Sequence, residues 1–101
     1  MKIKFSALSE RDLDDIFLYI NETLHNPTAA QNTINGIISL TAHLSDFPKL
    51  GVVLSIPNSS DLEIRYIVSG NYLIAYVVES THLEIVRILY ARSDYLRILG
   101  K

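Results

Sequence analysis

Apolar residues recur at helical spacing in the first half of the chain and at strand-like spacing in the second half. Over residues 10–24 they fall three or four positions apart, which predicts a helix with one apolar stripe, formed by Leu13, Ile16, Phe17, Ile20 and Leu24. Ser9 precedes this stripe and is the expected N-cap. Pro27 lacks a backbone donor and disfavours helix just before it, so the helix should end near residue 24.

The helical spacing resumes after Pro27 and predicts a second helix. Either Asn26 or Thr28 can cap its start, and the apolar pattern ends near Asp46. Two consecutive helices joined by a short link form an antiparallel hairpin. Each helix has an apolar face, so we expect the hairpin to pack on a sheet.

The second half of the chain is rich in β-branched and aromatic residues, which favour strands. Two polar clusters, at residues 69–71 and 79–82, interrupt it at the places where turns are needed. We therefore expect three strands in hairpin succession, at residues 62–68, 72–79 and 83–90. This antiparallel meander should form the centre of the sheet.

Strict alternation divides the side chains of the last strand between two faces of the sheet. One face would carry Leu83, Ile85, Arg87 and Leu89, and the other would carry Glu84, Val86, Ile88 and Tyr90. Both sets are rich in apolar residues. The alternation does not decide which face packs on the helix hairpin.

Shorter elements complete the predicted fold. Residues 2–5 alternate polar and apolar, which is typical of a short edge strand. Residues 52–56 suit a short extended piece, and residues 93–99 suit a final short helix. Together these features predict an α+β fold over residues 1–101, a single domain in which an N-terminal strand and a two-helix hairpin pack on an antiparallel β-meander sheet.

The composition adds limits to this picture. Hydrophobic residues make up 49% of the 101 residues, and charged residues only 20%. Such an apolar surplus fits either a surface that a partner protein covers or a homodimer interface. The absence of cysteine excludes disulfides and thiol chemistry. The longest apolar run, residues 72–78, is far shorter than the ~20 residues of a membrane helix, so we expect a soluble, cytoplasmic protein.

Charge is unevenly distributed along the chain. The net charge of −2 argues against a function built on broad neutralisation of phosphates. Residues 1–46 carry three Lys or Arg against six Asp or Glu, a net of −3. Residues 87–101 carry four Lys or Arg against one Asp, a net of +3. Basic character therefore concentrates at the C-terminal end.

Three short motifs in the predicted meander resemble those of the RelE/ParE superfamily of toxins. They are Arg65-Tyr66, Asn71-Tyr72-Leu-Ile-Ala-Tyr76 and Arg87-Ile-Leu-Tyr-Ala-Arg-Ser-Asp94. The last is similar to the family pattern Arg-x-Leu-His-x-Arg-Arg-Asp, although Tyr90 stands in place of the His and Ser93 in place of the second Arg. The two preceding helices also have the expected lengths, so the resemblance covers almost the whole chain. It implies the toxin of a type II toxin–antitoxin module.

The RNA-cleaving branch of this superfamily works inside the ribosome and activates a ribose 2′-hydroxyl. That chemistry requires a proton acceptor, a cation at the scissile phosphate and a general acid. By resemblance, the candidate catalytic positions are Arg65, Arg92, Tyr95 and Tyr90. However, Leu73 stands where this branch places an Arg in its central strand. Losing one such contact costs on the order of 3 to 4 kcal/mol of transition-state stabilisation.

The gyrase-poisoning branch, which is similar to ParE, lacks that catalytic set and acts by binding. Leu73 and the acidic net charge favour this branch. The resemblance therefore implies a growth-inhibiting protein that binds DNA gyrase and that a cognate antitoxin neutralises in a hetero-oligomer. Two alternatives stay open: a ribosome-dependent mRNA endonuclease, and an inactive interaction module of the same fold.

Each candidate residue also has a purely structural interpretation. Arg65 and Arg92 can pair with Glu63 or Asp94, and Tyr66, Tyr72 and Tyr76 can serve as packing residues of the strands. The three histidines, His25, His43 and His82, have no metal-ligand spacing. No glycine loop for phosphates and no dinucleotide fingerprint is present. We therefore expect neither a metal nor a cofactor.

Overall fold

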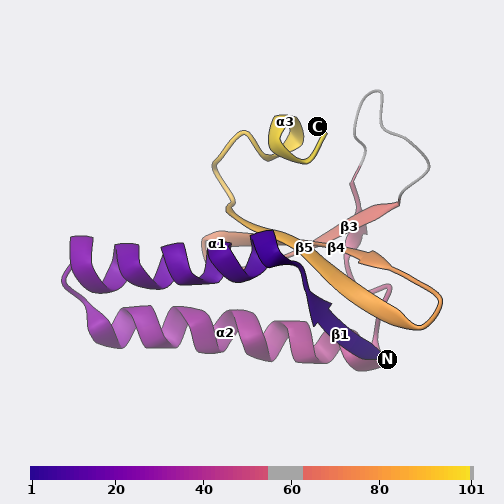
Figure 1. Cartoon of the computed structure of the whole chain (residues 1–101), viewed down its shortest axis with the longest axis horizontal. Coiled ribbons are helices and arrows are strands. Elements are labelled where there is room, and N and C mark those ends of the chain that lie inside the picture. Colours follow the sequence, from indigo (N-terminus) through magenta and orange to yellow (C-terminus); the bar gives the residue numbers. More distant parts are fainter. Residues whose placement is uncertain (55–62, 101) are drawn as a thin grey trace.

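The computed structural model describes residues 1–54 and 63–100, in which a mixed sheet carries a helix hairpin on one face and a short helix on the other (Figure 1). The predicted α+β architecture is confirmed. In chain order the elements are β1 (Lys2–Phe5), α1 (Ala7–Leu18), the π-helix η1 (Tyr19–Thr23), α2 (Pro27–Asp46), β2 (Val52–Val53), β3 (Ile64–Ser69), β4 (Tyr72–Val78), β5 (His82–Tyr90) and α3 (Tyr95–Leu99).

The sheet has the strand order β1-β5-β4-β3-β2. Strands β3, β4 and β5 form the predicted antiparallel meander, with Tyr72 opposite both Ser69 and Tyr90. Gly70 begins the tight β3–β4 turn with a φ of 57°, a conformation that glycine adopts without a steric penalty. Strand β1 lies at the edge, as expected, and pairs in parallel with β5. The chain then continues from β1 into α1.

The start of α1 differs from the prediction. Ser6, not Ser9, is the N-cap: its Oγ accepts a hydrogen bond of 3.0 Å from the Ser9 amide, so the helix begins at Ala7. The Ser6 hydroxyl also donates to the Val86 carbonyl at 2.8 Å, which fixes the cap against β5. Ser9 is fully buried and donates its hydroxyl to the Ser6 carbonyl at 2.9 Å. The second partner of this cap lies in a strand 80 residues away, so the residues next to Ser6 in the sequence could not indicate this contact.

The turn between the two helices lies just before Pro27, as predicted. The α-helical part of α1 ends at Leu18, and η1 carries the chain on to Thr23. A single π-helical turn of this kind is often found at functional sites. Of the two alternative caps for α2, Asn26 is the observed one, because its Oδ1 accepts from the Ala29 amide at 3.0 Å. The predicted end of α2 at Asp46 is confirmed.

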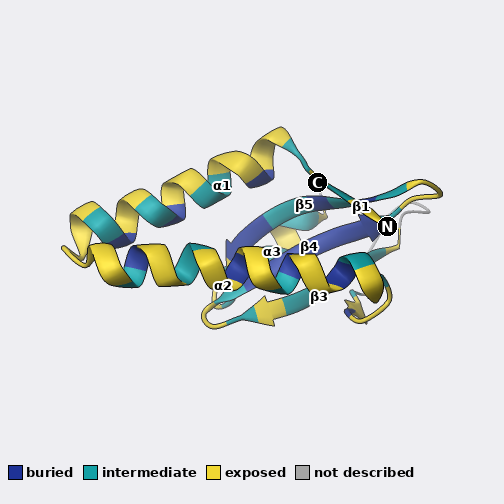
Figure 2. Ribbon diagram, turned by 90° about the horizontal axis from the view of Figure 1, so that it is seen from below, coloured by how far each residue is buried: buried dark blue, intermediate teal, exposed yellow. Residues whose placement is uncertain are grey.

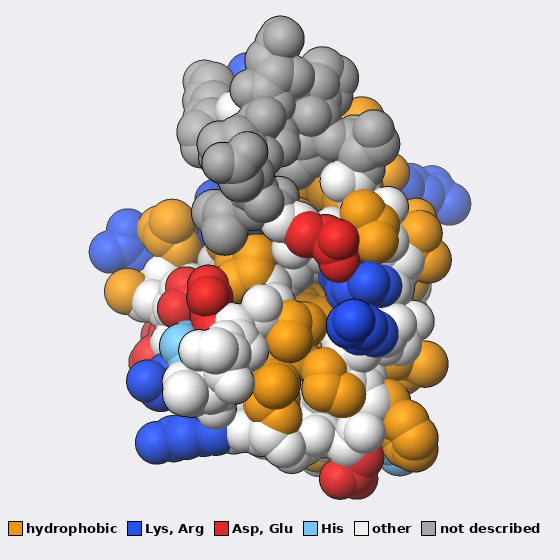
Figure 3. Space-filling view, turned by 90° about the vertical axis from the view of Figure 1, so that its right-hand side faces the viewer, with side chains coloured by type: hydrophobic (Ala, Val, Ile, Leu, Met, Phe, Trp, Pro, Cys, Tyr) orange, Lys and Arg blue, Asp and Glu red, His pale blue; other side chains and the backbone are white. Residues whose placement is uncertain are grey.

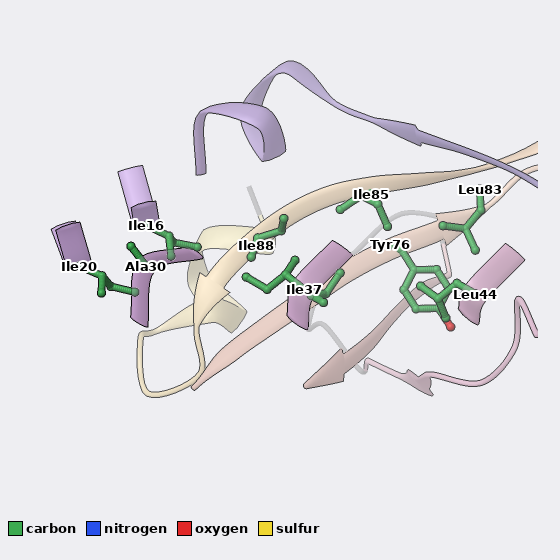
Figure 4. Close-up of a cluster of buried hydrophobic side chains, with 10 residues drawn as sticks. Ile16, Ile20, Ala30, Ile37, Leu44, Tyr76, Leu83, Ile85 and Ile88 are labelled. Atoms are coloured by element: carbon green, nitrogen blue, oxygen red, sulfur yellow. The ribbon is translucent and has the colours of Figure 1, made fainter. Parts of the chain in front are cut away.

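The core lies between the helix hairpin and the sheet. Its buried residues come from both helices and from β4 and β5 (Figure 4): Ile16, Ile20, Ala30, Ile37, Leu44, Ile74, Tyr76, Leu83, Ile85 and Ile88. Figure 2 shows the same arrangement as buried residues along the sheet and along one stripe of each helix. The Tyr76 hydroxyl satisfies its polarity by donating to the Pro48 carbonyl at 2.8 Å and accepting from the Gly51 amide at 2.8 Å.

A β-bulge changes the faces of β5. Ala75 pairs with Arg87 and Tyr76 with Ile85, so Val86 is an extra residue with no partner in β4. The bulge reverses the alternation, and Leu83, Ile85 and Ile88 therefore all pack on the helix hairpin. The division of this strand by strict alternation was wrong for that reason. The side of the sheet that carries Ile88 and Tyr90 after the bulge is the side that carries Ile85 before it.

Other boundaries differ by a few residues. Strand β2 is limited to Val52–Val53, and position 56 of the predicted extended piece lies outside the described residues. Strand β3 begins at Ile64, and position 62 of its predicted range is also outside them. Helix α3 begins at Tyr95 instead of residue 93, because the Ser93 amide closes a turn onto the Tyr90 carbonyl at 2.9 Å.

Candidate functional site

Arg65 lies in β3, next to the segment that leads into β2. Its guanidinium donates to the Gly51 carbonyl at 2.8 Å and pairs with the Glu63 carboxylate at 2.9 Å. Only 16% of the side chain is exposed. This ion pair with Glu63 agrees with the purely structural interpretation of Arg65, in which its charge is paired within the fold. These contacts hold the chain around Gly51 against the sheet.

The other three candidates lie together at the C-terminal end of β5 and in the segment that follows. Tyr90 is half-exposed and meets Tyr72 edge to face, with 6.0 Å between ring centroids. Arg92 is exposed in the turn, and Tyr95 begins α3. The register places Arg65 opposite Tyr76, four residues along β4 from Tyr72, which is about 13 Å of strand. Arg65 therefore lies about 13 Å along the sheet from the level of Tyr90, which pairs with Tyr72.

Asp12 joins α1 to β5 through hydrogen bonds that the sequence did not suggest. Its two carboxylate oxygens accept from the Arg87 guanidinium at 2.9 and 3.0 Å, and one of them also accepts from the Ile88 amide at 2.9 Å. Only 11% of the Asp12 side chain and 24% of the Arg87 side chain are exposed. The hydrogen bond to Asp12 raises the pKa of Arg87. The pair thus links the first helix to the last strand.

A groove of about 770 Å³ lies between the α1–η1 segment and the open end of the β4–β5 hairpin, where β4 begins and β5 ends. We call it the β5 groove. Its apolar lining comes from both sides, with carboxylates and an amide at the rim: Ile16, Tyr19, Ile20, Leu24, Ala29, Tyr72, Ile88, Leu89 and Tyr90, together with Asp12, Asp15, Thr33 and Asn71. Burial raises the pKa of Tyr72, and Tyr90 and Tyr19 add to the rise. Exposed Leu18 and Leu24 extend the apolar character along the hairpin tip.

A second apolar hollow, of about 600 Å³, lies at the opposite end of the molecule. Its apolar lining consists of Met1, Phe47, Pro48, Leu50 and Val78. Phe47 is 62% exposed and Leu50 is 55% exposed, so more than half of each large apolar side chain is left uncovered by the described chain. Figure 3 shows hydrophobic side chains gathered on this end of the molecule between charged ones. Part of the expected surplus of apolar surface thus lies in hollows at two ends of the described chain.

Leu73 lies in the middle of the sheet on the face away from the hairpin. It is only 2% exposed and pairs with Leu89 and Val68 on the neighbouring strands. Within residues 1–54 and 63–100, no cluster of His, Asp and Glu could hold a metal ion. Over the same residues, no helix combines the length and the apolar character that crossing a membrane requires.

Comparison with known proteins identifies the family. Residues 3–95 match a family model described as "ParE toxin of type II toxin-antitoxin system, parDE". The chain belongs to the ParE toxin family. The resemblance to the RelE/ParE superfamily, and within it to the ParE-like branch, is confirmed.

A solved structure shares the fold of this ParE-family chain. It is described as "Chromosomal ParDE TA system from P. aeruginosa" and superposes with a TM-score of 0.74 at 19% sequence identity. The superposition covers 91% of this chain and 97% of the other. No curated protein sequence matches the chain.

Proposed function

We propose that this protein is a toxin that stops growth by binding DNA gyrase and that a cognate antitoxin neutralises it. The observation that carries the proposal is the ParE family match over residues 3–95. The protein of similar fold from P. aeruginosa is described as a ParDE toxin–antitoxin system, which supports an antitoxin as the partner by analogy. Action on a target by binding requires exposed complementary surface, and the chain has apolar surface at both ends.

The positions of the candidate residues favour binding over RNA cleavage. Cleavage requires a cation, a proton acceptor and a general acid around one phosphate. Arg65 already binds a backbone carbonyl and a carboxylate, and it lies about 13 Å along the strands from the level of Tyr90. Leu73 is buried and apolar where the RNA-cleaving branch has an Arg. This separation argues against a catalytic site shared by Arg65 and Tyr90.

Ribosome-dependent mRNA cleavage is the second candidate function. It is favoured by one observation, the proximity in the chain of Tyr90, Arg92 and Tyr95, which supply one exposed cation and two phenols. In such a mechanism Arg92 would contact the phosphate and a tyrosine would handle the proton. The two functions predict different damage inside the cell.

Induction of the chain without any antitoxin tests both functions in one culture. Growth is followed while transcript 5′ ends are mapped across the genome shortly after induction. Binding to gyrase predicts arrest without new ends inside coding regions. Arrest with new ends clustered within translated codons would replace gyrase binding by mRNA cleavage. Normal growth in the presence of folded protein would favour the inactive interaction module. Co-expression with the product of the neighbouring reading frame is the control for neutralisation.

A further inference from the structure

The segment between α2 and β2, residues 47–51, forms a turn with a fixed shape. The Leu50 amide donates to the Phe47 carbonyl at 3.0 Å, which closes a β-turn with a proline at its second position, where the restricted φ of proline is favourable. Two largely buried side chains hold this backbone from the sheet, because the Tyr76 hydroxyl and the Arg65 guanidinium both bind it. The turn therefore has little conformational freedom to lose when a partner binds it.

This rigid turn presents two large apolar side chains to solvent. Phe47 and Leu50, its first and last residues, are each more than half exposed. Together with Met1, Pro48 and Val78 they line the second hollow, and we call these five residues the turn surface. Exposed apolar residues on a preorganised support, beside a hollow that can receive a side chain, are typical of the centre of a protein–protein interface.

The rim of the turn surface carries one charge of each sign. Asp46 and Lys49 both line the hollow and are both exposed, and neither forms an ion pair with another described residue. Figure 3 shows charged side chains of both signs around the hydrophobic ones at this end of the molecule. A purely acidic or purely basic partner would be repelled at one of the two charges.

A second copy of the chain meets these conditions. A two-fold interface uses the same patch on both subunits, so the patch has to be complementary to itself. Rotation about a two-fold axis can bring Asp46 of one copy to Lys49 of the other, and the same pair then forms a second time. The apolar residues between the two charges face each other in the same arrangement.

The turn surface lies far from the β5 groove. Ala29 lines the groove and Asp46 lines the hollow, and both belong to α2. At 1.5 Å per residue the helix separates the two positions by about 25 Å. A dimer formed through the turn surface therefore leaves the groove of each copy uncovered.

We propose that two copies of this chain associate through their turn surfaces around a two-fold axis. Phe47 and Leu50 of each copy cover the hollow of the other, and Asp46 of each copy pairs with Lys49 of the other. One dimer then presents two β5 grooves at its outer ends. The inference goes beyond the proposed function and does not depend on it.

The small size of the turn surface predicts a dimer that dissociates readily. Weak and transient interfaces bury less than about 1,200 Å² in total, and few large side chains per copy are available here. We expect a dissociation constant on the order of 10 µM. Sedimentation velocity of the full chain over about 1 to 100 µM covers this range.

The wild type should change from monomer to dimer over this range and reach a plateau at twice the monomer mass. A chain that stays monomeric at the highest concentration overturns the inference. Growth of larger species without a plateau at the dimer also overturns it, because that behaviour indicates non-specific apolar contact.

A matched pair of variants places the interface. Leu50→Glu should weaken the dimer by about tenfold or more, because it puts a carboxylate into the apolar contact. Leu24→Glu is the control: Leu24 is 54% exposed, against 55% for Leu50, but it lines the β5 groove at the other end. The control should leave the dissociation constant within about twofold. An equal or larger effect of Leu24→Glu places the contact elsewhere and overturns the inference. Circular dichroism checks that both variants are folded.

A charge exchange tests the two-fold pairing. Lys49→Asp should weaken the dimer by about fivefold, because an acidic residue then faces Asp46 of the other copy. Adding Asp46→Lys to the same chain reverses the pair and restores the net charge of the wild type, so it should bring the dissociation constant back to within about twofold. A double variant that dimerises as weakly as Lys49→Asp alone contradicts the two-fold arrangement.

Discussion

Replacing Asp12 with Ala should destabilise the protein more than replacing any exposed acidic residue of α1. The carboxylate accepts three hydrogen bonds, two from the Arg87 guanidinium and one from the Ile88 amide, and it is only 11% exposed. Removing one partner of a largely buried ion pair costs about 3 to 5 kcal/mol when the other charge stays buried. Arg87 is 24% exposed and can regain some water, so we expect a loss at the lower end, about 3 kcal/mol.

Urea unfolding monitored by circular dichroism measures this loss directly. About 3 kcal/mol corresponds to a Tm lower by roughly 12 to 24 °C for a domain of this size. Asp12→Asn keeps an acceptor for the Ile88 amide but loses the charge, so it should cost about half as much. Asp14→Ala, on the exposed face of the same helix, should stay within about 0.5 kcal/mol of the wild type.

A double-mutant cycle separates the ion pair from the backbone contact. Asp12→Ala and Arg87→Ala should couple by about 1 to 3 kcal/mol, because their carboxylate and guanidinium form two parallel hydrogen bonds. The part of the Asp12→Ala loss that remains in the Arg87→Ala background reports the Ile88 amide. Equal unfolding free energies for Asp12→Ala and Asp14→Ala would refute the account of α1 being held to β5 by this carboxylate.

Three further predictions concern the fold. Tyr76→Phe should cost about 2 to 3 kcal/mol in urea unfolding, because the buried Gly51 amide loses its acceptor. Burial raises the pKa of Tyr76, so the neutral phenol contributes fully to stability below pH ~10. This contribution to stability is lost as the pH rises through the pKa of Tyr76 in the folded state. The Tyr76→Phe variant should therefore lose less stability at alkaline pH than the wild type. Gly51→Ala should lower the unfolding free energy by more than about 2 kcal/mol, because a Cβ there would lie 2.6 Å from the Tyr76 hydroxyl. Gly36→Ala is the control: its Cβ would have its nearest neighbour at 3.4 Å, so it should be neutral or stabilising in thermal unfolding. Asn26→Ala should lower the unfolding free energy by about 1 kcal/mol through loss of the cap of α2.

Local patterns were sufficient to predict the elements that repeat regularly. The helical stripes gave α1 and α2, and the β-branched runs with polar turns gave β3, β4 and β5. Pro27 marked the hairpin turn correctly because its effect on the backbone is local. The short motifs within the same strands were sufficient to indicate the ParE toxin family, since each motif is a run of neighbouring residues.

Features that depend on distant contacts escaped the sequence. The bulge at Val86 reverses the faces of β5, but a bulge adds one residue without changing the composition of the strand. Asp12 is the sixth residue of α1, one of several acidic residues in this helix, and its partners lie 75 and 76 residues away in the chain. The β5 groove is lined by residues of α1, η1, α2, β4 and β5, so the spacing of residues within one element could not locate it.

The central claim is that this ParE-family protein acts by binding gyrase. Supercoiling of relaxed plasmid by purified DNA gyrase, with the full chain added alone and then with its antitoxin, tests it most directly. We predict that the chain inhibits supercoiling in a concentration-dependent way and that the antitoxin restores it. Unchanged supercoiling, together with cleavage of mRNA on purified translating ribosomes by the same preparation, would contradict the claim.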